Sequence, residues 1–214
     1  MDIPAIFASH RADGLVAVPA WFDGVRPVAV GAPVPFDEAT ASIPRSEERS
    51  PAVVVDLDSL SERTFSERVM KTMRVRGSDI WFMTHIETVD DLFDAFNTSA
   101  DIVMGAYHSS VSDAELEDIH SVSDSFVPVV YAIGGRAVLR QGKPGDLLET
   151  LSALADIGFY RTCVLDTDGS VTEATWEEIF DGFPSAVPFT RRRSGQEGPS
   201  RLWVSCLRAQ RCPR

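Results

Sequence analysis

Between residues 51 and 189 the chain alternates short apolar runs with stretches that have helical periodicity. The apolar runs, such as 51–58 and 79–85, lack strict alternation of polar and apolar residues, and each precedes a helix-like stretch. Strands of this kind are buried on both faces, which is typical of a parallel sheet whose strands are joined by helices. The pattern therefore predicts an α/β fold.

The predicted strands are 51–58, 79–85, 101–107, 126–132, 161–165 and 186–189, and the predicted helices are 61–75, 89–96, 113–120, 145–156 and 173–180. One or two further strands are expected within 15–30. About seven β/α units favour a (β/α)8 TIM-barrel-like fold that is incomplete at its C-terminus. An open doubly wound parallel sheet is the alternative, although no strand is followed by the glycine-rich loop of a dinucleotide or P-loop site.

The charge of the chain limits its partners. Its 20 basic and 32 acidic residues give a net charge of −12, which disfavours nucleic acid and anionic membranes as partners. Only two of the basic residues are lysine, which suggests an acidic protein of a halophilic proteome. Without a secretory signal, a bilayer-length apolar run or a disulfide pattern in its three cysteines, the chain is expected to be cytoplasmic.

The composition changes sharply near residue 190. Residues 190–214 contain seven arginines and one acid, for a net charge of +6, whereas residues 1–189 carry −18. We therefore expect a single barrel-like domain over 1–189 and a basic, irregular tail over 190–214. Three interpretations of the tail stay open: a basic arm, a disordered terminus, or a segment translated out of frame.

Polar residues gather where the predicted strands end, and parallel α/β folds carry their chemistry at that edge. The candidate acid–base residues are His85, His108, Tyr131, Asp58 and Asp166. The candidate substrate-binding residues are Asp56, Glu87, Ser109 and Asp168. Histidines and carboxylates at neighbouring strand ends suit proton transfer, and a divalent metal held by His85, His108 and a carboxylate is a further possibility. No other cofactor is indicated.

Several of these residues also have structural interpretations. Asp58 and Asp168 have the residue type of helix caps and Asx turns. His120 is expected to offset a helix dipole, and Cys163 to be an inert buried thiol. The aromatic residues expected in the core are Trp81, Phe82, Phe93 and Phe96.

Three segments carry a family resemblance. Residues 133–142 contain Gly134-Gly135-Arg136, residues 146–158 form a helix-like run that ends in glycine, and residues 164–169 end in a D-x-D-G turn. With the V-D-L-D run at 55–58, this order resembles the phosphate-binding TIM barrels of histidine biosynthesis, the ribotide isomerase and its sister cyclase. The resemblance implies a small phosphorylated, sugar-like or nucleotide-derived substrate and isomerase or lyase chemistry.

The chain departs from that family at the catalytic positions. The family has an aspartate at the end of its first strand, but the candidate first strands here, 3–7 and 18–22, lack one in that place. Where the family has a second aspartate, three residues before the glycine pair, this chain has Tyr131. Two hypotheses follow: a divergent enzyme that uses His85, His108 and Tyr131, or a non-catalytic, ligand-binding or degenerate paralogue.

Overall fold

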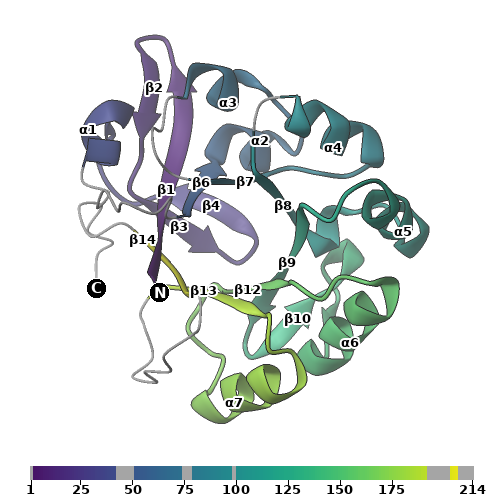
Figure 1. Cartoon of the computed structure of the whole chain (residues 1–214). Helices are drawn as coiled ribbons and strands as arrows, with labels where there is room; N and C mark the ends of the chain where they lie inside the picture. Colours follow the sequence, from purple (N-terminus) through teal and green to yellow (C-terminus); the bar gives the residue numbers. More distant parts are fainter. Residues whose placement is uncertain (1, 42–50, 74–78, 98–99, 192–202, 207–214) are drawn as a thin grey trace.

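A computed structural model describes residues 2–41, 51–73, 79–97, 100–191 and 203–206, which form a mixed α/β fold with a mostly parallel sheet (Figure 1). The parallel strands are β1 (Asp2–Arg11), β6 (Ala52–Asp56), β7 (Ile80–Thr84), β8 (Ile102–Ala106), β9 (Phe126–Ile133), β12 (Cys163–Asp166), β13 (Val187–Thr190) and β14 (Trp203–Cys206). The short antiparallel strands are β2 (Gly14–Ala17), β3 (Ala20–Asp23), β4 (Arg26–Ala29), β5 (Val34–Pro35), β10 (Arg136–Val138) and β11 (Pro144–Gly145). The helices are α1 (Phe36–Ala41), α2 (Leu57–Glu62), α3 (Arg68–Thr72), α4 (Val89–Phe96), α5 (Asp113–Val122), α6 (Leu147–Ile157) and α7 (Glu173–Gly182), with 3-10 turns η1 (Tyr107–Ser109) and η2 (Arg140–Gly142).

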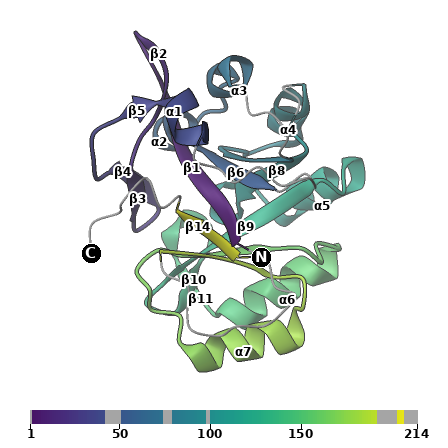
Figure 2. The same cartoon turned by 60° about the vertical axis from the view of Figure 1, so that its left-hand side comes forward.

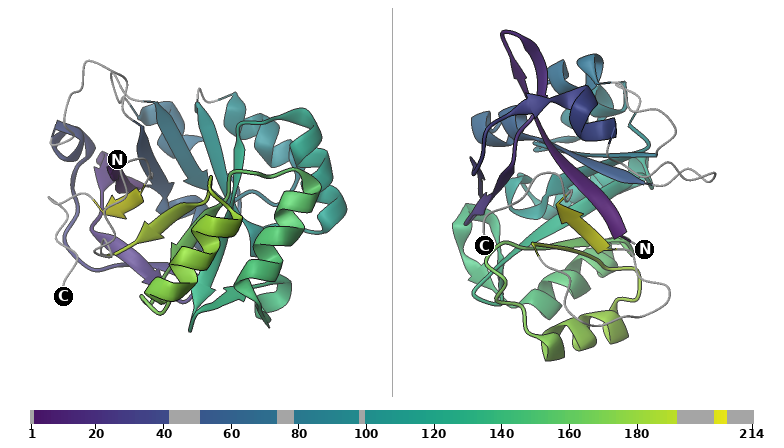
Figure 3. Two further views of the ribbon diagram at one scale, coloured as in Figure 1. Left: turned by 60° about the horizontal axis from the view of Figure 1, so that its bottom comes forward. Right: turned by 90° about the vertical axis from the view of Figure 1, so that its left-hand side faces the viewer.

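The parallel strands pair in the order β1, β6, β7, β8, β9, β12, β13 and β14, and β14 in turn pairs with β1. Figures 1 and 3 show the helices outside these strands. Each of the six strands predicted between residues 51 and 189 overlaps one of the parallel strands. Because the pairing is parallel throughout, the carboxyl ends of these strands all lie at one end of the molecule.

Alternate residues of the parallel strands belong to different buried clusters. In β6, Val53 and Val55 belong to a buried cluster that draws residues from every parallel strand. Their neighbours Ala52 and Val54 belong to a second cluster, which includes residues of α1 and α3, and a third cluster lies under α4 to α7. Burial of both strand faces explains the continuous apolar runs and confirms the α/β prediction.

The predicted single helix over 61–75 is replaced by two shorter helices, α2 and α3, and its residues 74–75 lie outside the described residues. Asp56 caps α2 by accepting hydrogen bonds from the N–H groups of Asp58 and Ser59, so the helix begins earlier than expected. It ends at Arg63, whose backbone is left-handed (φ 55°, ψ 44°) and whose N–H donates to the Ser59 carbonyl. The chain resumes helical structure only at α3, because this left-handed residue terminates the first helix.

The β3–β4 hairpin, which lies between β1 and β6 in the sequence, packs at the carboxyl ends of the parallel strands. β1 is the first parallel strand, so the candidate at 3–7 is correct and the one at 18–22 lies mostly in β3. β3 and β4 form an antiparallel hairpin with a two-residue turn, in which Gly24 has φ 59°. Trp21 and Phe22 of this hairpin join the cluster shared by the parallel strands, and Trp21 Nε1 donates to the Thr167 carbonyl at 2.6 Å.

Two further predictions need correction. No strand was expected after residue 189, but β14 lies between β13 and β1 (Figure 2). One of its pairing partners, β1, lies at the other end of the sequence, so local periodicity cannot predict that pairing. Phe93 was expected in the core but is 50% exposed, whereas Leu92 beside it on α4 is fully buried.

Among the residues that the structure describes, no helix combines the length and apolar character needed to cross a bilayer.

Candidate functional site

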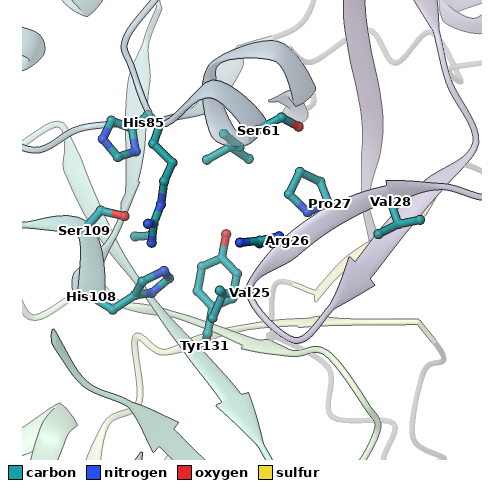
Figure 4. Close-up of a pocket in the computed structure, with 12 residues that line it drawn as sticks. Val25, Arg26, Pro27, Val28, Ser61, His85, His108, Ser109 and Tyr131 are labelled. Atoms are coloured by element: carbon teal, nitrogen blue, oxygen red, sulfur yellow. The ribbon is translucent and has the colours of Figure 1, made fainter. Parts of the chain in front are cut away.

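A cavity of about 420 Å³ lies at the carboxyl ends of β6 to β9, with the β3–β4 hairpin on its other side (Figure 4). Its lining residues are Val25, Arg26, Pro27, Val28, Leu60, Ser61, Arg63, His85, Ala106, His108, Ser109 and Tyr131. This volume suits a small molecule. The cavity brings together four of the predicted site residues: His85, His108, Ser109 and Tyr131.

A buried hydrogen-bond network fixes the position of His85 directly after β7. Ser59 Oγ accepts from Thr84 Oγ1 at 2.8 Å and from the His85 N–H at 3.1 Å, and it donates to the Thr64 carbonyl. His85 is only 7% exposed, and its Nε2 atom has no hydrogen-bond partner. Glu87 Oε2 lies 3.7 Å away, which allows an ion pair with a protonated imidazole but is too long for a hydrogen bond. The network therefore fixes the backbone of His85, and its side chain lines the cavity with a nitrogen that makes no hydrogen bond.

His108 and Tyr131 form the second part of the site. Their rings meet edge to face, with centroids 4.7 Å apart, and His108 Nδ1 is buried without a hydrogen-bond partner. Burial, together with the smaller effects of the neighbouring Arg63 and His85, lowers the pKa of His108 to about 4. The imidazole is therefore neutral at physiological pH and can accept a proton.

Tyr131 projects from β9 and is 1% exposed, with Phe22 of the hairpin packed edge to face against it at 5.4 Å. Burial raises the pKa of its phenol well above the ordinary value, so the hydroxyl keeps its proton. Figure 4 shows the Tyr131 hydroxyl and the side chains of His108, Ser109 and Arg26 pointing toward the same space. Tyr131 can therefore donate a hydrogen bond to a bound molecule.

Sequence reasoning missed the two arginines of the site. Arg63 follows α2 and Arg26 begins β4, and among the described residues neither side chain has an ion pair or hydrogen bond. The lining contains no aspartate or glutamate, although the whole chain carries −12. The Asp23-Gly24 pair is a hairpin signal, but nothing local indicates that the hairpin would meet β6 to β9.

The structure places the first two predicted aspartates outside the cavity lining. Asp56 is fully buried as the cap of α2, and burial raises its pKa to about 7. Asp58 accepts hydrogen bonds from Ser9 Oγ at 2.7 Å and from the His10 N–H at 2.6 Å. The cap is therefore Asp56 and not Asp58, and Asp58 ties β1 to α2.

Asp166 and Asp168 serve the turn after β12. Asp166 accepts from the Ser170 N–H, and burial raises its pKa. Asp168 accepts from Ser170 and from the Gly134 N–H. Burial acts to raise the pKa of Asp168, but these hydrogen bonds outweigh it and lower the pKa. Asp168 therefore has the structural, turn-closing role that its sequence position also suggested.

The remaining residues singled out from the sequence lie outside the cavity lining. Glu87 reaches the site only through its contact with His85. Cys163 is a buried free thiol whose pKa burial raises, as expected of an inert cysteine. His120 packs edge to face on Phe159, with ring centroids 5.0 Å apart. Within the described ranges, no group of three histidine, cysteine, aspartate or glutamate side chains has a geometry that could hold a metal ion.

The fold and the site define an α/β protein with a mostly parallel sheet and a cation-lined cavity of small-molecule size at its strand ends. No protein-family model matches the chain, and a search of curated proteins finds no match.

The neutral state of His108 can be tested directly. We expect NMR titration of its imidazole to give a pKa near 4, because burial and two neighbouring positive groups disfavour the imidazolium. Arg63→Gly should raise this pKa, since it removes one of those charges. The exposed Arg136 is the matched control, and Arg136→Gln should leave the titration unchanged. A midpoint close to 6.5 in the wild-type protein would contradict the burial of His108.

Proposed function

We propose that this protein is a (β/α)8-barrel enzyme that transfers a proton on a small phosphorylated metabolite, with His108 as the base and Tyr131 as the hydrogen-bond donor. The observation that carries the proposal is the edge-to-face His108–Tyr131 pair in a cavity lined by arginines and no carboxylate. The order of strand pairings, which begins and ends at β1, supports the barrel.

Location supports an active site. In (β/α)8 enzymes the chemistry takes place at the carboxyl ends of the strands, and the cavity lies at that end of β6 to β9. The hairpin covers part of the same end through Trp21 and Phe22. A partly covered cavity limits the access of water, which strengthens hydrogen bonds and charge interactions inside it.

The protonation states suit proton abstraction next to a carbonyl group. His108 is neutral and has an unused nitrogen, so it can take a proton from carbon. A bound anion would raise the pKa of His108, because it offsets the positive charges that add to the larger effect of burial. Tyr131 keeps its proton and can stabilise the negative charge that develops on the carbonyl oxygen. His85 and Ser109 would contact the same ligand.

The resemblance to the histidine-biosynthesis barrels favours a sugar-like or nucleotide-derived phosphate and an isomerase or lyase reaction. The carboxylates of that family are replaced here by a different acid–base pair, with Tyr131 in β9 and His108 after β8. We therefore propose a related reaction class with its own catalytic groups.

A second candidate is a non-catalytic ligand-binding barrel. The observation in its favour is that the four aspartates predicted for the site accept structural hydrogen bonds and do not line the cavity.

The test is hydrogen exchange from solvent. We expect the wild-type protein, incubated in D2O with a panel of aldose and ketose phosphates, to incorporate deuterium next to the carbonyl of at least one of them. Tyr131→Phe and His108→Gln should each slow that exchange by about 100-fold or more, because each removes a group that acts in the transition state.

His120→Gln is the matched control, since His120 lies outside the cavity and packs on Phe159. It should leave the exchange rate unchanged. Binding of a sugar phosphate without exchange in any case would favour the non-catalytic candidate.

A further inference from the structure

We propose that Arg26 and Arg63 clamp the phosphate group of the ligand between the β3–β4 hairpin and the end of α2, as a phosphate monoester dianion. This inference deepens the proposed function and rests on it for the kind of ligand.

The first argument is that both guanidinium groups are available. Arg26 and Arg63 come from two separate segments, line the same cavity, and have no ion-pair or hydrogen-bond partner among the described residues. The protein has many more acidic than basic residues, so two arginines without a carboxylate in one cavity are a local exception. Arginine suits phosphate because its planar fork can donate two parallel hydrogen bonds.

The second argument is the backbone of Arg63. Its φ of 55° lies in the left-handed region, which favours glycine and strains other residues. Glycine would end α2 with less strain, but it would place no cation in the cavity. Strained backbone concentrates at functional positions, and here it places a charged side chain at the cavity.

The third argument is the unused nitrogen of His85. The side chain is more than nine-tenths buried and lines the cavity, and its Nε2 has no hydrogen-bond partner, since the Glu87 carboxylate is 3.7 Å away. Buried polar atoms normally have a partner. A phosphate oxygen would provide one, so a third donor accompanies the two arginines.

The fourth argument excludes the Gly134–Gly135 turn as the phosphate site. The Gly134 N–H donates to Asp168 Oδ2 at 2.8 Å, and the Gly135 N–H donates to Ser170 Oγ at 2.6 Å. Both amides are therefore occupied by the turn after β12 and are not free to bind phosphate. The arginines across the cavity are the available cationic groups.

Titration with inorganic phosphate at constant ionic strength, followed by thermal unfolding, tests the clamp. Wild-type protein should be stabilised in a saturable way, and more by phosphate than by acetate. Arg26→Gln and Arg63→Gly should each weaken phosphate binding by about tenfold or more, because each removes a charge-assisted contact. Arg63→Gly also relieves the backbone strain, so it should fold at least as well as the wild type.

Arg136→Gln, the exposed control, should bind phosphate as the wild type does. A second arm compares ribose 5-phosphate with ribose. Stabilisation by the phosphate ester, lost in the same two variants, supports a monoester as the ligand. Stabilisation by inorganic phosphate but not by ribose 5-phosphate would overturn the assignment of a phosphate monoester as the ligand.

Phosphate affinity that is unchanged in both variants, or absent in the wild type, would overturn the clamp. The proposed proton transfer is judged separately by deuterium exchange in Tyr131→Phe and His108→Gln. If both arginine variants lose phosphate binding but no exchange is seen, the protein binds anions without the proposed proton transfer. If exchange is seen but phosphate affinity is unchanged in the variants, other residues of the site bind the phosphate.

Discussion

Asp56→Asn is expected to stabilise the protein by up to about 4 kcal/mol at pH 8 and by almost nothing at pH 4. Asp56 is fully buried, and burial raises its pKa from 3.8 to about 7, more than its hydrogen bonds from Ser59 and Asp58 lower it. One carboxylate oxygen, Oδ2, has no hydrogen-bond partner. The ionised side chain is therefore poorly solvated in the folded protein.

The direction of the pH dependence follows from the raised pKa. Between pH 3.8 and about 7 the folded protein keeps the proton of Asp56 and the unfolded chain has lost it. The contribution of this group to stability is therefore complete below pH 3.8 and is lost as the pH rises to 7. Asparagine cannot ionise, and its carbonyl oxygen can still accept the two hydrogen bonds of the cap.

Urea unfolding of the wild type and the variant across this pH range measures the difference. Asp146→Asn is the matched control, because Asp146 caps α6 in the same way but is exposed. It should change the unfolding free energy by less than about 1 kcal/mol. If Asp56→Asn destabilises the protein equally at pH 4 and pH 8, the prediction is wrong, because the ionised carboxylate would then be stabilised in the folded protein.

Trp21→Ala is expected to destabilise the protein by about 3–5 kcal/mol, the usual cost of removing a buried tryptophan. Trp21 is 1% exposed and contacts Phe7, Phe22 and Phe189 edge to face. Its indole N–H donates a hydrogen bond from the hairpin to the Thr167 carbonyl. Loss of the ring would leave a cavity and a buried carbonyl without its donor.

The same change should weaken phosphate binding, because Arg26 reaches the cavity only when the hairpin is docked. Trp176→Ala is the matched control: Trp176 is 2% exposed, stacks on Phe180 of the same helix α7, and lies outside the cavity. Both variants should unfold at lower urea concentration. Only Trp21→Ala should lose affinity for phosphate when measured at a temperature where both remain folded. Equal losses in the two would show that the hairpin does not position Arg26.

The order of strands and helices follows directly from the sequence. Helix α4 occupies the predicted residues 89–96, and α6 ends at Gly158, whose φ of 119° suits the predicted glycine cap. These features depend on residues close together in the chain, since periodicity and capping are local. Phe93 was misassigned for the same reason: it fits the local apolar spacing of α4, but the packing of the helix leaves it facing outward.

The candidate site was predictable only in part. His85, His108, Ser109 and Tyr131 were found because parallel strands bring their carboxyl ends to one edge. The four aspartates lie at the same edge but do not line the cavity, and residue type does not reveal which hydrogen bonds a carboxylate accepts.

The sequence by itself determined the alternation of strands and helices and the residues at the strand ends, because these follow from local burial patterns. Only the tertiary structure decided that β14 pairs with β1, that Trp21 docks the hairpin, and that Arg26 and Arg63 share a cavity. Those contacts join residues tens of positions apart or more. Their formation depends on strand pairing and packing across the whole fold, which no short stretch of sequence encodes.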